Sequence, residues 1–368
     1  MSRLTPSAER QLIAFARLLV DPDGARVAIP PSKPLPGYWF GGGNVTVGPD
    51  GALYLVGRYR DAGDSRTGLA AGERGWALVL FRSHNRGQSF EKIATWTKCD
   101  LSQPGREVLS IEGSALRWGD SGVELFVSSE KAGIPYPTGL ESYRKPGCGV
   151  WTIERIAAPT WQELIRAAPE TILASDDPEH LHLKDPRCYE SNGERVLMCC
   201  SHPFNWASSN TVFVSLSHGV ATGEPPRYGW FPRGTTWDVA MTRGTCLVDM
   251  PSQPGWNGHR VTLLFYDGGE CVRDLAQHPA AVARPRGYSC EELGGLAYVL
   301  DGDFTRIERL SRTMPLFVSP CGTGCHRYVD VLVTPEGYLA TWQQSQTDGS
   351  QPLMIRFCER AAAERVLG

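Results

Sequence analysis

A hairpin pattern that occurs five times along the chain places the tightest limit on its fold. Each copy has an apolar-to-polar lead-in, a glycine-centred turn and a short apolar strand that ends polar. The middle copy, KDPRCYESNGERVLMCCSH, spans residues 184–202, and the others span residues 41–60, 111–131, 245–269 and 327–346. Intervals of 71, 71, 65 and 79 residues separate the turn glycines Gly51, Gly122, Gly193, Gly258 and Gly337.

Hairpins with such turns, repeated at nearly constant separation, are typical of sheets arranged radially around an axis. The repeat therefore predicts an all-β fold, a five-bladed β-propeller. Before it, Thr5-Pro6 and the following SAERQLIAFARLLV predict a short capped helix with Leu12, Ala16 and Leu19 on one face. We expect three regions: an N-terminal helix and extended lead-in (1–37), the propeller (38–358) and a C-terminal tail (359–368).

The net charge argues against two classes of binding partner, and the cysteine content indicates the cellular compartment. The formal net charge is -3, from 37 basic and 40 acidic residues, so neither nucleic acid nor an anionic membrane is expected as a partner. Arg10 and Arg17 interrupt the first apolar run, which argues against a signal peptide. The 11 cysteines are an odd number, and Cys199 and Cys200 are neighbours in a predicted strand. Free thiols and a cytoplasmic location are the expectation.

The chemistry is expected where the repeats begin, because the first strand of each propeller blade lines the central channel. Unlike polar residues occupy these positions: Asn44, Glu112, Lys184 with Asp185, Asp238, and Arg327 with Asp330. Carboxylates and Asn also cap turns at strand ends. Turn caps alone do not explain the apolar and glycine neighbours in IEGSAL, KDPR and TWD. Glu112 lies between Ile111 and Gly113, where burial is expected to raise its pKa, as a general acid requires.

These motifs resemble those of the five-bladed propeller glycoside hydrolases, the superfamily that includes families 43, 32, 62, 117 and 130. Asp185-Pro186 is similar to the Asp-Pro of their third blade, which orients and tunes the acid, and IEGSAL is similar to their Glu-containing strand start. Ser83 to Phe90 resembles the Asp-box of sialidases and related propellers, with Asn85 at the Asp position. The Asp-box is a marker of the fold and not of a site.

The resemblance implies a glycosidase that acts on a small glycoside or oligosaccharide, with a furanoside as one such substrate. Inverting members of family 43 place a base Asp in the first blade, where this chain has Asn44. The roles are therefore permuted around the channel, or phosphate replaces the activated water as in family 130. The candidate catalytic residues are Glu112, Asp185, Asp238, Glu291 and Glu292. The candidate substrate-binding residues are Trp39, Asn44, Arg58, Lys184, Trp237 and Arg327.

No cofactor and no metal site are predicted, although His180 and His182 near Asp185 leave a single divalent ion in the channel open. Two other functions also stay open. A non-catalytic glycan-binding propeller would need only polar groups beside an aromatic face. A sialidase-like enzyme would need three arginines around a carboxylate, for which Arg58, Arg243 and Arg327 are available. The sugar, the linkage, the stereochemical outcome and the oligomeric state are not predicted.

Overall fold

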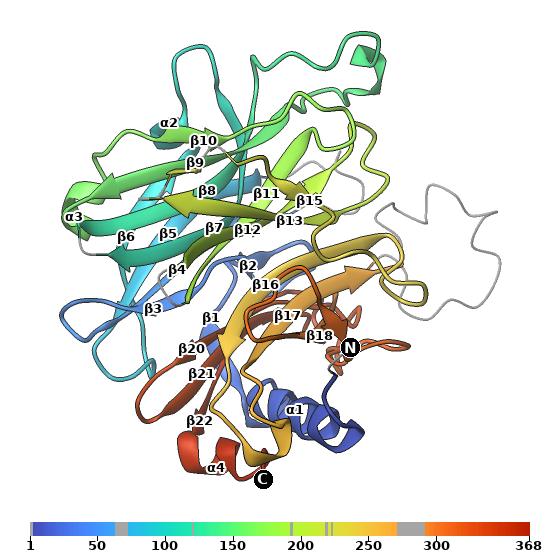
Figure 1. The fold of residues 1–368 in the computed structure, drawn as a ribbon. Coiled ribbons are helices and arrows are strands. Elements are labelled where there is room, and N and C mark those ends of the chain that lie inside the picture. The colour runs from blue at the N-terminus through green and yellow to red at the C-terminus, as the bar shows by residue number, and fades with distance from the viewer. Residues whose placement is uncertain are drawn as a thin grey trace.

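The computed structural model describes residues 3–62, 73–119, 121–191, 194–217, 220–221, 224–270 and 291–368. Its strands form five antiparallel sheets, which are the five blades of a propeller (Figure 1). The innermost strands contact one another in the order β3, β7, β11, β16, β20 and back to β3. The ring of blades is therefore closed, as the repeat predicts.

The first blade consists of β2 (Trp39–Gly41), β3 (Val45–Val47), β4 (Leu53–Asp61), β5 (Glu73–Ser83) and β6 (Glu91–Thr97). The second consists of β7 (Val108–Gly119), β8 (Gly122–Lys131), β9 (Val150–Ala158) and β10 (Glu170–Leu173). The third consists of β11 (His182–Ser191), β12 (Glu194–His202), β13 (Asn210–Ser217), β14 (Val220–Ala221) and β15 (Arg227–Tyr228). The fourth consists of β16 (Met241–Asp249), β17 (Val261–Gly269), β18 (Leu293–Leu300) and β19 (Glu308–Arg309).

The fifth blade joins the two ends of the chain. It consists of β20 (His326–Val333), β21 (Gly337–Gln344), β22 (Leu353–Glu359) and the N-terminal β1 (Arg26–Ile29). β1 pairs antiparallel with β22, with Arg26 opposite Ile355. The predicted extended lead-in thus contains a strand of the propeller, and the propeller begins before residue 38. Pairing β1 with β22 covers an edge that would otherwise be open and ties the ring shut.

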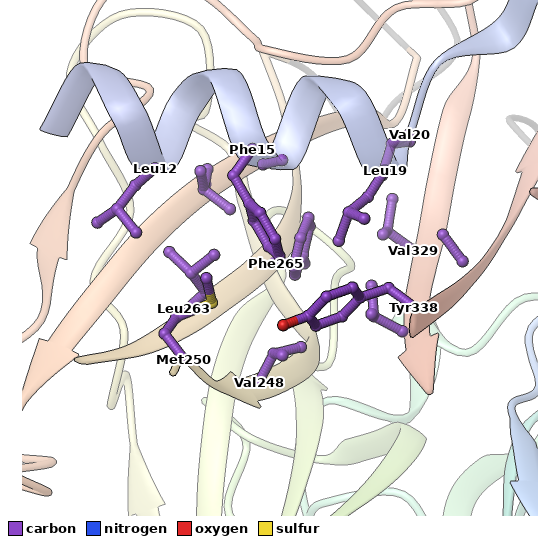
Figure 2. Packing of buried hydrophobic residues seen from close by; sticks show 14 of the residues in the cluster. Leu12, Phe15, Leu19, Val20, Val248, Met250, Leu263, Phe265, Val329 and Tyr338 are labelled. Carbon is purple, nitrogen blue, oxygen red and sulfur yellow. The ribbon is translucent and has the colours of Figure 1, made fainter. Parts of the chain in front are cut away.

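Helix α1 (Pro6–Leu19) confirms the predicted N-terminal helix. The Thr5 hydroxyl accepts the Ala8 N–H at 3.2 Å, so of the two cap residues that the sequence allows, Thr5 and Ser7, the N-cap is Thr5. Its buried face packs between the fourth and fifth blades, where Phe15 meets the Tyr338 ring edge-on with 5.1 Å between centroids (Figure 2). The short C-terminal helix α4 (Arg360–Glu364) lies in the same region and adds Ala363 to this cluster. None of the helices that the structure describes has the length and apolar character needed to cross a bilayer.

Two further helices are short. Helix α2 (Lys98–Leu101) follows β6 of blade one, and helix α3 (Trp161–Leu164) lies between β9 and β10 of blade two. The Asp-box-like turn joins β5 to β6, with Gly87 at a φ of 80°. Its Asn85 Oδ1 accepts the Ser89 N–H at 2.9 Å, so the side chain holds its own turn. Of the five repeat turns, the one at Gly193 lies outside the described residues. Among the described cysteines, Cys199 and Cys200 are both buried free thiols.

Candidate active site

The innermost strand of every blade is interrupted where it passes the channel. In blade one the strand is divided into β2 and β3, with Gly42 between them at a φ of 73°. The other innermost strands change register within β7 (Ile111/Ser114), β11 (Lys184/Arg187), β16 (Gly244/Cys246) and β20 (Arg327/Asp330). An irregularity of this kind turns one side chain out of the alternating pattern of a strand. The interruptions therefore bring polar side chains of all five blades to one region.

Asp185 and Tyr328 lie at two of these interruptions with left-handed backbones, at φ values of 57° and 56°. Non-glycine residues rarely adopt this conformation, which costs on the order of 1–3 kcal/mol. Hydrogen bonds hold it here. Asp185 Oδ1 accepts the Gly113 N–H at 3.0 Å, and the Asp185 N–H donates to Ser128 Oγ at 3.1 Å. The strain is stored at the centre of the predicted site.

Glu112 of β7 forms a two-point ion pair with Arg58 of β4. Its Oε2 accepts from Arg58 Nε at 2.8 Å and from Nη2 at 2.5 Å, while Lys184 Nζ lies 3.9 Å from Oε1. Burial raises the pKa of Glu112, but the charges of Arg58 and Lys184 outweigh burial and bring it to about 2. The expectation of a raised pKa at Glu112 is therefore wrong. The side chain is a carboxylate at neutral pH.

Arg243 of β16 connects three carboxylates. Its Nη1 is 2.9 Å from Asp185 Oδ2, and its Nη2 is 2.6 Å from Asp267 Oδ2 and 2.5 Å from Glu292 Oε2. Arg327 Nη1 pairs with the same Glu292 oxygen at 2.8 Å. Burial raises the pKa of Glu292, but Arg243 and Arg327 bring it down to about 2.

The two remaining carboxylates of this network differ in their pKa. Burial also acts on Asp185, but Arg243 and Lys184 lower its pKa below the usual value. At Asp267, burial prevails over the charge of Arg243 and raises the pKa to about 6. The network thus contains carboxylates with both lowered and raised pKa values.

The Tyr328 ring lies at the centre of this cluster. The guanidinium carbon of Arg243 is 4.0 Å from the ring centroid, and those of Arg327, Arg187 and Arg58 are 5.3, 5.6 and 5.7 Å away. The Tyr328 hydroxyl donates to Asp185 Oδ1 at 3.3 Å, and its backbone N–H donates to Asp267. Basic side chains of blades one, three, four and five thus surround one buried aromatic ring.

Asn44 and Asp330 join neighbouring blades. The Asn44 amide donates to the Leu116 carbonyl at 2.9 Å and accepts the Leu116 N–H at 2.8 Å. Asp330 Oδ2 accepts the Val45 N–H at 3.0 Å, and burial raises the Asp330 pKa to about 6. Both polar atoms of Asn44 are therefore engaged by the protein, whereas the sequence predicts that Asn44 binds substrate.

Asp238 and Trp237 lie within blade four, away from the arginine cluster. Asp238 pairs with Arg309 of β19 at 2.9 Å and accepts from the Tyr266 hydroxyl at 3.1 Å, and burial raises its pKa. Trp237 Nε1 donates to the Ser311 carbonyl at 2.9 Å. The described contacts of this pair do not reach Glu112, Asp185 or Glu292. Blade four instead contributes Arg243.

The remaining predicted residues are Trp39, Lys184 and Glu291. Trp39 is buried between two guanidiniums, with Arg327 at 4.5 Å and Arg60 at 4.6 Å from its ring centroid. Lys184 Nζ lies 4.5 Å from the centroid of the Trp151 ring. Glu291, next to Glu292, is half-buried, and its charge adds to burial in raising the pKa of the Cys325 thiol.

Four residues of the cluster were not among the sequence candidates: Arg60, Arg187, Asp267 and Tyr328. A signal existed for two of them. Arg60 follows Arg58 by two residues and so shares its strand face, and Arg187 ends the KDPR motif. Asp267 lies on the second strand of its blade and not at a repeat start. Tyr328 lies at a repeat start, but it is aromatic and not one of the charged or amide side chains expected there.

The histidines considered as metal ligands have other partners. His180 Nδ1 is 3.0 Å from Ser201 Oγ, and the ring stacks on Tyr228 at 3.9 Å. His182 stacks on Trp206 at 4.2 Å. Within the ranges that the structure describes, no group of three or more His, Cys, Asp or Glu side chains is arranged to hold a metal ion.

Known structures share this fold at low sequence identity. An α-L-arabinofuranosidase from Lactobacillus brevis matches with a TM-score of 0.58 and 11% identity, over 91% of this chain and 93% of that one. The GH43_1 enzyme from Xanthomonas citri in complex with xylotriose matches with a TM-score of 0.53 and 10% identity, over 95% and 93%. An endo-arabinase from Bacteroides thetaiotaomicron VPI-5482 matches with a TM-score of 0.53 and 11% identity, over 91% and 97%. No protein-family profile and no curated protein sequence matches the chain. The fold is thus that of five-bladed propeller glycoside hydrolases.

Proposed function

We propose that the protein is a glycoside hydrolase that binds a small glycoside or oligosaccharide over the channel cluster. The observation that carries this proposal is the convergence of three carboxylates from three blades: Glu112 and Asp185 lie at interrupted innermost strands, and Glu292, just before β18, is held by Arg243 and Arg327. Glycoside hydrolysis requires two carboxyl groups that flank the scissile bond. A fold shared with arabinofuranosidase, arabinase and xylotriose-binding structures supports the same chemistry and makes a furanoside a reasonable first substrate.

Glu112 and Glu292 are the carboxylates that we assign to the substrate. Their side chains are 11% and 28% exposed, whereas the Asp185 side chain is 1% exposed. Asp185 is a positioning residue in this proposal, because it holds the Arg243 guanidinium and the Gly113 backbone. A carboxylate that reaches solvent can approach a glycosidic oxygen or a water, and a buried one cannot.

Proton donation needs a change in the cluster. Arginine charges keep both Glu112 and Glu292 ionised in the free protein. A substrate hydroxyl or anionic group that draws a guanidinium away from one carboxylate raises the pKa of that carboxylate. The carboxylate that loses its partner becomes the general acid, and the other acts as base or nucleophile.

Hydrolysis of a panel of aryl glycosides tests the proposal. The panel contains pyranosides, furanosides and a sialoside, each with and without inorganic phosphate. Cleavage of one class without phosphate supports a hydrolase, and cleavage that depends on phosphate indicates a phosphorylase. If no member is cleaved, the hydrolase proposal fails. A cytoplasmic location stays a prediction from the sequence.

A non-catalytic glycan-binding propeller is the second candidate. Asn44 favours it, because Asn44 occupies the predicted place of a base and both of its amide groups are bonded to Leu116. A binding module needs no proton transfer. A sugar that raises the melting temperature without being cleaved would identify this function.

A further inference from the structure

The channel cluster contains more basic than acidic side chains. Among the described residues, six basic side chains gather there: Arg58, Arg60, Lys184, Arg187, Arg243 and Arg327. Five acidic side chains face them: Glu112, Asp185, Asp267, Glu292 and Asp330. The nearby Glu130 pairs with Arg74 at 3.0 Å and leaves the balance unchanged.

Two buried arginines of the cluster have no ion pair among the described residues. Arg60 is 5% exposed and Arg187 is 3% exposed, and neither has an acidic side chain within ion-pair distance in the part of the chain that the structure describes. Their Nε and Nη2 atoms are also without hydrogen-bond partners there. Burial of a cation without a counter-charge is unfavourable unless a negative charge is supplied from elsewhere.

Protein oxygens already occupy Arg58 and Arg243 in this structure, so an external anion would first have to displace a carboxylate from either of them. Arg58 binds Glu112 and the Gly41 carbonyl, and Arg243 binds three carboxylates. The arginine triad of a sialidase-like site is therefore already engaged within the protein.

Lys184 is the basic side chain that an anion can reach. Its side chain is 15% exposed, and its nearest carboxylate oxygen, on Glu112, is 3.9 Å away, which is too far for a hydrogen bond. The ammonium lies 4.5 Å from the Trp151 centroid and 5.6 Å from the Trp206 centroid. The three donors of an ammonium are not satisfied by aromatic faces alone.

Trp206 provides an apolar wall beside this ammonium. It is half-buried, it has a left-handed backbone at a φ of 57°, and its ring stacks on His182 at 4.2 Å. A bulky residue seldom adopts that conformation, so this loop position is an unusual place for a tryptophan. The half-buried indole beside the Lys184 ammonium and the partly exposed Glu112 suits a sugar ring that carries an anionic substituent.

We propose that the natural ligand is an acidic sugar, whose carboxylate binds Lys184 while its ring packs on Trp206. The location rests on the proposed function, since Glu112 is the shared edge of the two sites. A bound carboxylate also adds negative charge to a cluster that holds six basic and five acidic side chains. A phosphate group has related chemistry, so the test must separate a sugar carboxylate from free phosphate.

Calorimetric titration of the full-length protein tests this proposal without turnover. The ligands are glucuronate and galacturonate, their neutral counterparts glucose and galactose, and inorganic phosphate. We expect one uronate to bind about tenfold more tightly than its neutral counterpart, and added salt to reduce the difference. Lys184→Met keeps the aliphatic stem against the tryptophans and is expected to abolish the preference. Lys92→Met, at an exposed site on β6, should leave it unchanged.

Three results would overturn the proposal: equal binding of uronate and neutral sugar, an unchanged preference in Lys184→Met, or tight binding of phosphate without any preference for uronates. These results differ from failure of the proposed function. Uronate binding without cleavage of any glycoside removes the hydrolase and leaves the acidic-sugar site. Cleavage of neutral glycosides with no uronate preference does the reverse.

Discussion

Arg243 Nη1 donates to Asp185 Oδ2 at 2.9 Å and joins the innermost strands of the third and fourth blades. Both side chains are almost fully buried, and the same guanidinium also binds Asp267 and Glu292. One cation thus compensates several carboxylates at the centre of the propeller. The loss of a buried cation leaves its partners charged and without solvent.

Replacement of this cation should therefore be costly for stability. We expect Arg243→Gln to lower the free energy of unfolding by about 3–5 kcal/mol, because Asp185 and Asp267 stay buried without a counter-charge. Urea denaturation measures the loss. Arg306→Gln is the control, since Arg306 forms an exposed pair with Asp303 at 3.8 Å and its replacement should leave the free energy of unfolding nearly unchanged. Equal losses in the two variants would show that the cluster is not held by Arg243.

Gly113 gives a steric test of the position of Asp185. A Cβ atom at Gly113 would lie 2.4 Å from Asp185 Oδ1 and 2.8 Å from Asp185 Cα. Gly113→Ala should displace Asp185, reduce stability by about 1–3 kcal/mol and lower activity with it. Gly255→Ala is the matched control, because no atom lies within 4 Å of the added Cβ. A wild-type rate in Gly113→Ala would show that catalysis does not depend on where Asp185 sits.

The stability of the protein should depend on pH through Asp330. Burial raises its pKa from 3.8 to about 6, so the native state holds a proton that the unfolded state releases near pH 4. The stabilisation is complete below about pH 4 and is lost as the pH rises through about 6. Between pH 4 and pH 7 the wild type should lose roughly 1–3 kcal/mol of unfolding free energy through Asp330. Asp330→Asn keeps an acceptor for the Val45 N–H and should not show this loss.

Urea midpoints at several pH values provide the comparison between wild type and Asp330→Asn. Glu112 and Glu292 act in the opposite direction at lower pH, since their pKa values fall from 4.5 to about 2. Their contribution appears as the pH rises from about 2 to 4.5 and is the same in both proteins. Parallel curves for the two proteins between pH 4 and pH 7 would refute the assignment to Asp330.

Variants of Asn44 test whether this residue has a structural role or stands in place of a lost catalytic base. Asn44→Ala removes both hydrogen bonds to Leu116 and should destabilise the protein by about 1–3 kcal/mol, with a small effect on turnover. Asn44→Asp loses the donor to the Leu116 carbonyl and should also be less stable, with no gain in rate. Denaturation and the aryl glycoside assay read out the two effects. A faster Asn44→Asp would instead identify this position as a missing base.

The sequence predicts the fold in detail because the fold is repetitive. The glycine turns occur once per blade, and the helix before them carries its own cap at Thr5 and its own apolar face. The strand β1 escapes prediction for a physical reason. It has four residues, it has no hairpin partner nearby in the sequence, and its pairing with β22 joins the two ends of the chain.

The candidate site is only partly predictable. The structure gathers Glu112, Asp185 and Glu292 with their basic partners. The motifs place Glu112 and Asp185 at repeat starts, whereas Glu292 is a further candidate outside them. Asp238 lies three residues before β16, and the register change within that strand brings Arg243 to the channel instead. A side chain's direction at such an interruption depends on local register, which strand periodicity does not specify.

Ion pairing, and not burial alone, determines the pKa values of the site carboxylates. The neighbours Ile111 and Gly113 suggest an apolar environment for Glu112, and burial does act to raise its pKa. Arg58 comes from the preceding blade, 54 residues earlier, and the packing of the first blade against the second brings it within 2.5 Å. Charge partners from separate blades therefore determine the protonation of the site.

The most direct test of the account is the turnover of a cleaved aryl glycoside by Glu112→Gln and by Glu292→Gln, beside Glu91→Gln on the exposed edge of β6. Both channel variants should stay folded with a lowered melting temperature, because each leaves a buried arginine without its carboxylate, and should lose about 10²- to 10⁴-fold in kcat, while Glu91→Gln matches wild type. Folded Glu112→Gln and Glu292→Gln proteins that turn over at the wild-type rate would contradict the assignment of these carboxylates to the chemistry.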